Sequence, residues 1–114
     1  MTAKIGAKSI FVTQRSARWD IVDGRLVGIP ALPEHEAAHL EAFGPLNGVD
    51  YFTIERVVGD AIMQQCNAVK AICIDLAKEI KFDLRRDFYD GAHTTAAGSR
   101  VIGEYLYRAL ADKI

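Results

Sequence analysis

The chain has 114 residues, of which 50% are apolar and 25% charged, and its formal net charge at pH 7 is -1. This length is enough for one small domain, and the balanced charge excludes the strongly basic surface that nucleic-acid binding requires. No run approaches the roughly 20 apolar residues that span a bilayer, and no signal-peptide pattern follows Met1. We therefore expect a cytoplasmic protein with neither a nucleic-acid nor a membrane partner.

Two β elements are predicted in the first third of the chain. KSIFVTQ, residues 8–14, is a short apolar run typical of a buried strand. WDIVDGRLVGIP, residues 19–30, places Asp23-Gly24 between β-favouring pairs, which is a signal for a tight hairpin. Trp19 lies in this hairpin, and we expect it to pack the hairpin onto the body of the protein rather than to line a substrate pocket.

Two helices are predicted next. EHEAAHLEAF, residues 34–43, is a short polar candidate that Gly44-Pro45 stops. A long amphipathic helix is predicted at about 53–78, because apolar residues recur there at intervals of three or four. These residues are Val57, Val58, Ala61, Ile62, Cys66, Val69, Ile72, Cys73 and Leu76.

The two cysteines, Cys66 and Cys73, both fall on the apolar face of this predicted helix. A rise of about 1.5 Å per residue would separate their Cα atoms by roughly 10 Å. Such a separation is too large for a disulfide bond. We therefore expect two free thiols that pack in the core as small apolar groups, with a reactive thiol as the alternative.

The last third predicts a strand, a loop and a helix. EIKFDL, residues 79–84, alternates apolar and charged positions as a strand does, and a loop follows at 85–94. An apolar stripe then predicts a helix from about 95 to 112, with Thr94 or Thr95 as N-cap. The whole order is typical of an open α/β sheet whose parallel strands are joined by helical crossovers. Two parallel strands alone would make a poor sheet, since parallel sheets normally have more strands and are covered on both faces.

FYDGAHTTAAGS, residues 88–99, places Asp90 three positions before His93. Histidine serves as a general base near neutral pH when a carboxylate holds its other ring nitrogen. Reactive groups of open α/β sheets also gather on loops at the carboxyl ends of strands. The spacing alone is weak evidence, because 15 acidic residues and three histidines make it common by chance. A polar loop with a capping interaction is the plain alternative.

The longer segment FYDGAHTTAAGSRVIGEYLYRAL resembles the last sequence block of the SGNH (GDSL-type) hydrolases. There a strand ending in Asp-Leu precedes Tyr-Asp-x-x-His, a small or hydroxyl pair, glycine and an amphipathic helix. The resemblance implies the C-terminal part of a three-layer α/β/α, flavodoxin-like domain that hydrolyses a carboxylic ester or O-acetyl group of a small molecule without metal or organic cofactor. It implies that His93 activates a serine and that Asp90 orients His93. Asn67 and IFVTQ extend the similarity upstream, but only the last third is specific.

The other catalytic parts of that family are absent from these 114 residues. No Gly-Asp-Ser motif is present, Ser9 lies inside the first predicted strand, and LNGVD, residues 46–50, has its asparagine in a different pattern from the family's Gly-x-Asn-Asp. Three explanations stay open: a truncated remnant, a fold retained for binding, or a second chain or copy that completes the sheet. Because losing the nucleophile lowers the rate by several orders of magnitude, we expect an almost inactive isolated chain.

A competing motif is HEAAH, residues 35–39, which matches the H-E-x-x-H pattern of zinc peptidases. Pro33 precedes it where the metal-bearing helix should be under way, and Glu41 stands where an apolar anchor is expected. No third histidine follows at the required spacing, and nothing signals Glu55 or Asp60 as the third ligand. We interpret the segment as a solvated helix face, with a zinc peptidase as the alternative.

Three residues beside the Asp90 and His93 motif also bear on function. Arg85 and Arg86 are candidates for binding a substrate anion, although adjacent arginines at a strand end are usually just solvated. Tyr89 is expected to anchor the loop rather than to act as an acid.

Overall fold

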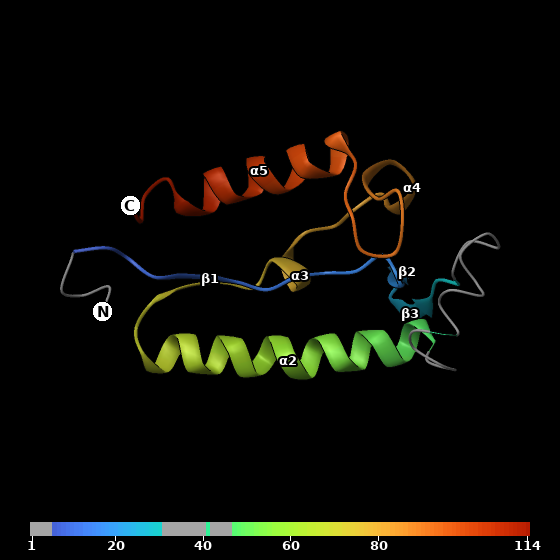
Figure 1. Ribbon diagram of the computed structural model, residues 1–114, viewed down its shortest axis with the longest axis horizontal. Helices are drawn as coiled ribbons and strands as arrows, with labels where there is room; N and C mark the ends of the chain where they lie inside the picture. Colours follow the sequence, from blue (N-terminus) through green and yellow to red (C-terminus); the bar gives the residue numbers. More distant parts are fainter. Residues whose placement is uncertain (1–5, 31–40, 42–46) are drawn as a thin grey trace.

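The computed structural model describes residues 6–30, 41 and 47–114 (Figure 1). In chain order the described elements are β1 (Ile10–Val12), β2 (Trp19–Val22), β3 (Arg25–Gly28), α2 (Gly48–Ala68), β4 (Ile72–Ile74), α3 (Leu76–Glu79), α4 (Leu84–Asp87) and α5 (Ala96–Leu110). Apart from Glu41, the helix predicted at 34–43 lies outside the described residues, and so does HEAAH. Within the described ranges, every helix is too short or too polar to cross a membrane.

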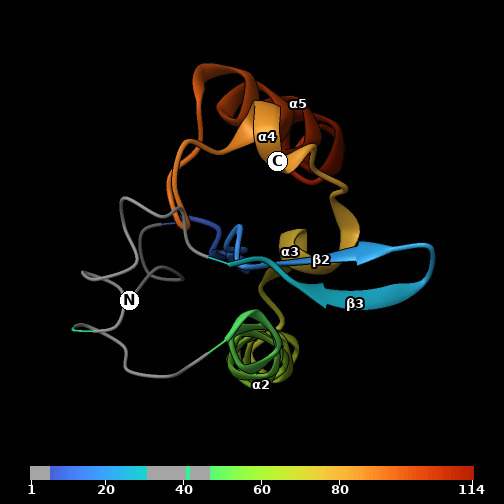
Figure 2. The ribbon, with the colours of Figure 1, turned by 90° about the vertical axis from the view of Figure 1, so that its right-hand side faces the viewer.

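Strands β1 and β4 form a two-stranded parallel sheet in which Ile10 pairs with Ile72 and Val12 with Ile74. Helix α2 lies on one side of these strands and α5 on the other, as the views in Figures 1 and 2 agree. The predicted α/β class with few parallel strands is confirmed. The finer likeness to the C-terminal part of an SGNH-like domain stays a prediction.

The second parallel strand is not the one that the sequence predicted. Residues 79–84 contain the end of α3 and an extended segment that pairs with no strand of the described chain, whereas β4 lies at Ile72–Ile74. The alternation at 79–84 has another cause. Phe82 is buried in the core, and Ile80 and Leu84 pack against the same cluster, so the segment presents one apolar side without a ladder partner.

Helix α2 differs from its prediction at both ends. It begins at Gly48 because Asn47 caps it: the Asn47 side chain accepts hydrogen bonds from the N–H groups of Val49 and Asp50, and Asp50 returns one. It ends at Ala68 because Lys70 takes a positive φ of 57°, which turns the chain back toward β1. Residues 69–75 were therefore wrongly predicted as helix, and residues 76–78 belong to the separate short helix α3.

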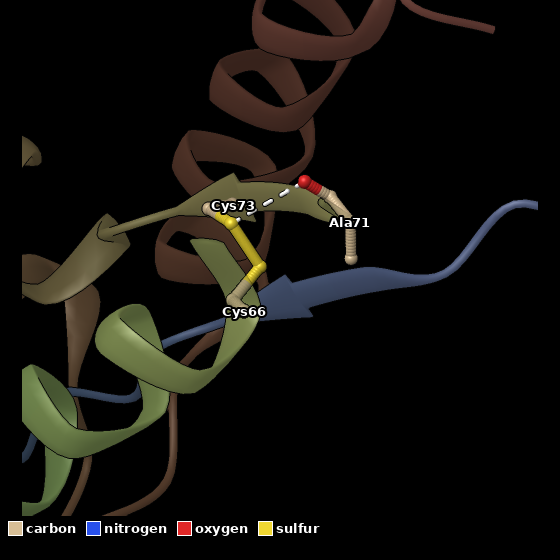
Figure 3. Close-up of a disulfide and its surroundings, with 3 residues drawn as sticks. All are labelled: Cys66, Ala71 and Cys73. Carbon is tan, nitrogen blue, oxygen red and sulfur yellow. Dashed lines mark hydrogen bonds between the residues drawn. A yellow bond between two sulfur atoms is a disulfide. The ribbon is translucent and has the colours of Figure 1, made fainter. Parts of the chain in front are cut away.

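Cys66 and Cys73 form a disulfide bond, with Cα atoms 5.9 Å apart (Figure 3). The prediction of two free thiols is wrong, because it assumed one continuous helix through both residues. Cys66 is buried in the last turn of α2, the chain reverses, and Cys73 lies in the middle of β4. The bond therefore fastens the end of α2 to the sheet, and closing this short loop stabilises the fold by about 2 kcal/mol.

The predicted hairpin is confirmed as β2 and β3, with Asp23 and Gly24 in the left-handed conformation that a tight turn requires. Trp19 anchors it, as predicted. The buried indole packs edge-on against Phe52 of α2 and donates a hydrogen bond of 2.7 Å to Glu55. Gly48 allows the close approach, since a Cβ there would collide with the Arg18 carbonyl oxygen.

Helix α5 confirms the predicted terminal helix and its cap, because the Thr95 hydroxyl accepts the N–H of Gly98. Its apolar side packs on a buried cluster of Ala17, Ile74, Leu76, Phe82 and Phe88. Gly98 lies directly against the backbone of Asp87, where a Cβ would collide with the carbonyl oxygen. This contact fixes α5 to α4 and thereby sets the loop between them.

Candidate active site

The loop between α4 and α5 holds Asp90 and His93, and backbone hydrogen bonds close it. Phe88 and Thr94 form an isolated antiparallel bridge, in which the N–H of Tyr89 donates to the His93 carbonyl. Below it, the N–H of Thr95 donates to the Asp87 carbonyl at 2.9 Å. The two ends of the loop are therefore held together, and the side chains between them project from a defined turn.

Asp90 and His93 are in direct contact within this turn. Oδ1 of Asp90 accepts the N–H groups of Ala92 and His93 at 2.8 and 2.7 Å, and Oδ2 lies 2.7 Å from Nδ1 of His93. The ring of Tyr89 stacks on the imidazole with centroids 5.6 Å apart. The structure thus brings together the two residues that the sequence singled out, and their catalytic roles stay a prediction.

The surroundings of Asp90 keep it ionised. The N–H of Ala92, followed by that of His93 and the imidazole, lowers the pKa of Asp90 from 3.8 to about 2, against the opposite effect of burial. An ionised carboxylate at Nδ1 favours the tautomer with hydrogen on Nδ1, which leaves the lone pair on Nε2. The His93 side chain is 67% exposed, and no described residue forms a hydrogen bond with its Nε2.

The loop lies against the chain that leaves the carboxyl end of β1 (Figure 1). The N–H of Ala17 donates to the carbonyl of Gly91, between Asp90 and His93, at 2.9 Å. The segment after a parallel strand and the loop carrying the pair are therefore neighbours. This is the edge of an open α/β sheet at which ligands bind.

The hydroxyl groups near His93 have other partners. Thr94 and Ser99 bond to each other at 2.8 Å, and the Thr95 hydroxyl donates to the Arg86 carbonyl. Among the described residues, no serine or threonine hydroxyl forms a hydrogen bond with His93. A hydroxyl nucleophile for this pair would have to come from elsewhere.

The basic and aromatic neighbours differ in their roles. Arg86 pairs with the fully buried Asp87 through two hydrogen bonds, whereas Arg85 forms no ion pair with a described residue. Tyr89 is exposed, and its ring stacks on the imidazole of His93 within the same loop. Its role as a loop anchor stays a prediction.

The sequence missed a second polar cluster at the same sheet edge. Thr13 follows β1 and Asp75 follows β4, and the Thr13 hydroxyl donates to Asp75 at 2.8 Å. Arg56 of α2 donates to both carboxylate oxygens, at 3.2 and 2.9 Å. Burial raises the pKa of Asp75, but the hydrogen bonds from Arg56 and Thr13 outweigh it and hold that pKa below its ordinary value. Their positions just after two β-rich runs were the available signal.

No group of three or more metal-binding side chains gathers in the part of the chain that the structure describes. Of the two carboxylates considered as a third zinc ligand, Glu55 accepts a hydrogen bond from Trp19 and Asp60 accepts one from Arg56. The interpretation of HEAAH as a solvated helix face stays a prediction, as does the zinc-peptidase alternative, because the motif lies outside the described ranges.

The chain matches no protein-family model, no curated protein and no solved structure. The resemblance to the SGNH hydrolases therefore rests on the residues themselves.

Proposed function

We propose that Asp90 and His93 perform general-base chemistry in the hydrolysis of a carboxylic ester or O-acetyl group, within the C-terminal part of an SGNH-like domain. His93 Nε2 takes the proton of a serine hydroxyl supplied from outside these 114 residues. Asp90 holds the productive tautomer and stabilises the imidazolium that forms. The proposal requires no metal or organic cofactor.

One observation carries this proposal: the 2.7 Å contact between Asp90 Oδ2 and Nδ1 of His93, whose side chain is 67% exposed. A capping interaction alone would need only Oδ1, which already accepts two backbone N–H groups. The second carboxylate oxygen thus contacts the imidazole, and a polar turn does not require this second contact. The position beside the chain leaving β1 supports the same role.

The missing hydroxyl can be replaced by a small alcohol, which gives a direct test. We would follow p-nitrophenyl acetate cleavage by the full chain while trifluoroethanol is added. The alcohol oxygen attacks the acetyl carbon, its proton passes to His93 Nε2 and then to water, and p-nitrophenolate leaves. We expect an alcohol-dependent rate that His93→Ala abolishes, that Asp90→Asn lowers about tenfold, and that a chelator leaves unchanged.

The other two histidines provide the matched control. The double variant His35→Ala/His39→Ala should keep the alcohol-dependent rate, whereas a zinc peptidase would lose activity in that variant and after chelation. A normal rate in His93→Ala would overturn the proposal. The rate should fall about twofold in deuterium oxide if His93 transfers a proton, and a nucleophilic imidazole would show little such effect.

A non-catalytic interaction domain is the second candidate, and one surface favours it. Ile54, Val57 and Val58 of α2 lie on its solvent side, and Val57 is 66% exposed. Val57 and Val58 were predicted to lie on the apolar face of the helix, and the described chain leaves all three residues exposed. A serine-bearing second chain, or a second copy of this one, could cover this face or extend the two-stranded sheet.

A further inference from the structure

We propose that the hollow beside Asp90 binds the anionic end of the substrate through Arg18 and Arg85. This inference rests on the proposed function, since it assigns a substrate class to the same site. The class is an ester that carries a carboxylate on a short apolar group.

The hollow has the shape and composition for such a group. It measures about 380 Å³ and lies between the chain leaving β1, the end of β3, α4 and the Asp90 loop. Its apolar side is formed by Ala17, Ile29, Pro30, Leu84 and Phe88. Pockets of this size with a few placed polar groups are typical of small-molecule sites.

The described residues that line the hollow contribute more positive than negative side chains. Among the described residues that line it, the charged ones are Arg18, Arg85 and Asp90. Both oxygens of Asp90 already accept hydrogen bonds from its own loop. Within the described lining, the two guanidinium groups are therefore the charged groups available to a ligand, and paired arginine donors suit a carboxylate.

Arg18 stands apart from the other partly buried arginines of the described chain. Arg15 pairs with Asp20, and Arg56 pairs with Asp75 and Asp60. Arg18 forms no ion pair with any described residue, and its guanidinium lies 5.9 Å from the Tyr51 ring centroid. A partly buried cation without a counter-ion is costly, so an incoming anion is stabilised there.

The loop backbone holds the Arg18 side chain in place. A Cβ on Gly91 would collide with the Arg18 guanidinium, so the glycine provides the space that this group occupies. Gly91 is also hydrogen-bonded to Ala17, next to Arg18. The anion site and the Asp90 and His93 pair are therefore parts of one small loop assembly, which would place the ester of a bound substrate close to His93.

The test measures binding without turnover. The backbone amides of Ala17 and Gly91 would be followed by NMR during titration with phenylbutyrate and with its neutral analogue phenylbutanol. We expect phenylbutyrate to bind about tenfold more tightly. Arg18→Gln and Arg85→Gln should each reduce this preference several-fold, and Gly91→Ala should reduce it while leaving both charges present. Arg108→Gln on α5 is the matched control and should change nothing.

The outcomes separate this inference from the proposed function. Equal affinity for the acid and the alcohol, or an unchanged preference in the Arg18→Gln/Arg85→Gln double variant, would overturn the anion site. His93-dependent ester cleavage without a carboxylate preference would leave the proposed function standing and this inference rejected. Carboxylate binding without His93-dependent cleavage would support the anion site and reject the proposed function.

Discussion

Two carboxylates lie near the carboxyl edge of the parallel sheet, Asp75 and Asp90, and each contacts a basic side chain. Asp75 is held by Arg56 and Thr13, and the Asp75 and Arg56 side chains are both 17% exposed. Asp90 is held by its own loop and by His93, and the two side chains are 28% and 67% exposed. The first pair links α2 to both strands, and the second links only residues three positions apart.

The difference between these pairs separates stability from chemistry. Every group in the Asp75 cluster faces a partner from another element, so removing one charged member takes away the main counter-charge of its largely buried partner. The exposed pair adds little to stability, because solvent screens it. Its imidazole keeps one nitrogen available for a reacting proton. The pair that looks weaker on energetic grounds is therefore the better candidate for catalysis.

The largest effect should come from breaking the buried pair. Asp75→Ala leaves the Thr13 hydroxyl without its acceptor and Arg56 with only the exposed Asp60, and we expect a loss of about 2 to 3 kcal/mol in the free energy of unfolding. Urea unfolding followed by the fluorescence of Trp19 measures this loss.

Two variants provide the comparison for Asp75→Ala. Asp60, the other carboxylate on Arg56, is 71% exposed, so Asp60→Ala should cost less than about 0.5 kcal/mol. His93→Gln should be equally mild. If all three variants were equally destabilising, the distinction between the two pairs would fail.

An intermediate effect should come from the glycine that positions the Asp90 loop. Gly98→Ala forces a Cβ against the Asp87 carbonyl oxygen, so α5 must move away from α4. We expect a loss of about 1 to 2 kcal/mol and shifted NMR signals for His93. Gly103→Ala in the same helix meets open space and should stabilise by up to about 1 kcal/mol. Equal effects of the two substitutions would mean that the close approach is not formed.

The smallest effect concerns acid pH. Asp90 has a folded pKa of about 2, below its ordinary value of 3.8. Its contribution to stability is therefore complete above about pH 4 and is lost as the pH falls from about 4 to 2. NMR titration of the Asp90 carboxyl carbon should show this low midpoint. A midpoint near 3.8 would indicate that the N–H groups of Ala92 and His93 do not hold the carboxylate in solution.

The elements that the sequence predicted correctly have local signals. The β2–β3 hairpin follows from Asp23-Gly24, α5 from its apolar stripe and Thr95, and the Asp90 and His93 contact from their spacing on one turn. Each depends on residues fewer than about 20 positions apart, so local propensity, turn residues and capping residues were sufficient to predict it.

The failures come from long-range pairing. Ile72–Ile74 continues the helical spacing of the preceding residues, and only β1, far away in sequence, makes it a strand. Lys70 takes a left-handed conformation that usually marks glycine, so the end of α2 carried no sequence signal. The disulfide was not predicted because this turn, which brings Cys73 back to Cys66, was not predicted. Arg18, which we propose as an anion-binding residue, carried no sequence signal for the same reason, since its place beside Gly91 depends on how the chain after β1 packs.

The register of the parallel sheet also has a consequence for biosynthesis. Ile10 pairs with Ile72, 62 positions later, so β1 leaves the ribosome long before its partner exists. At about 5 to 20 residues per second, the wait is roughly 3 to 12 seconds. The hairpin and α2 can form during this interval, because their contacts are local. The parallel sheet therefore closes last, once Ile72–Ile74 has been synthesised and can pair with the waiting Ile10–Val12.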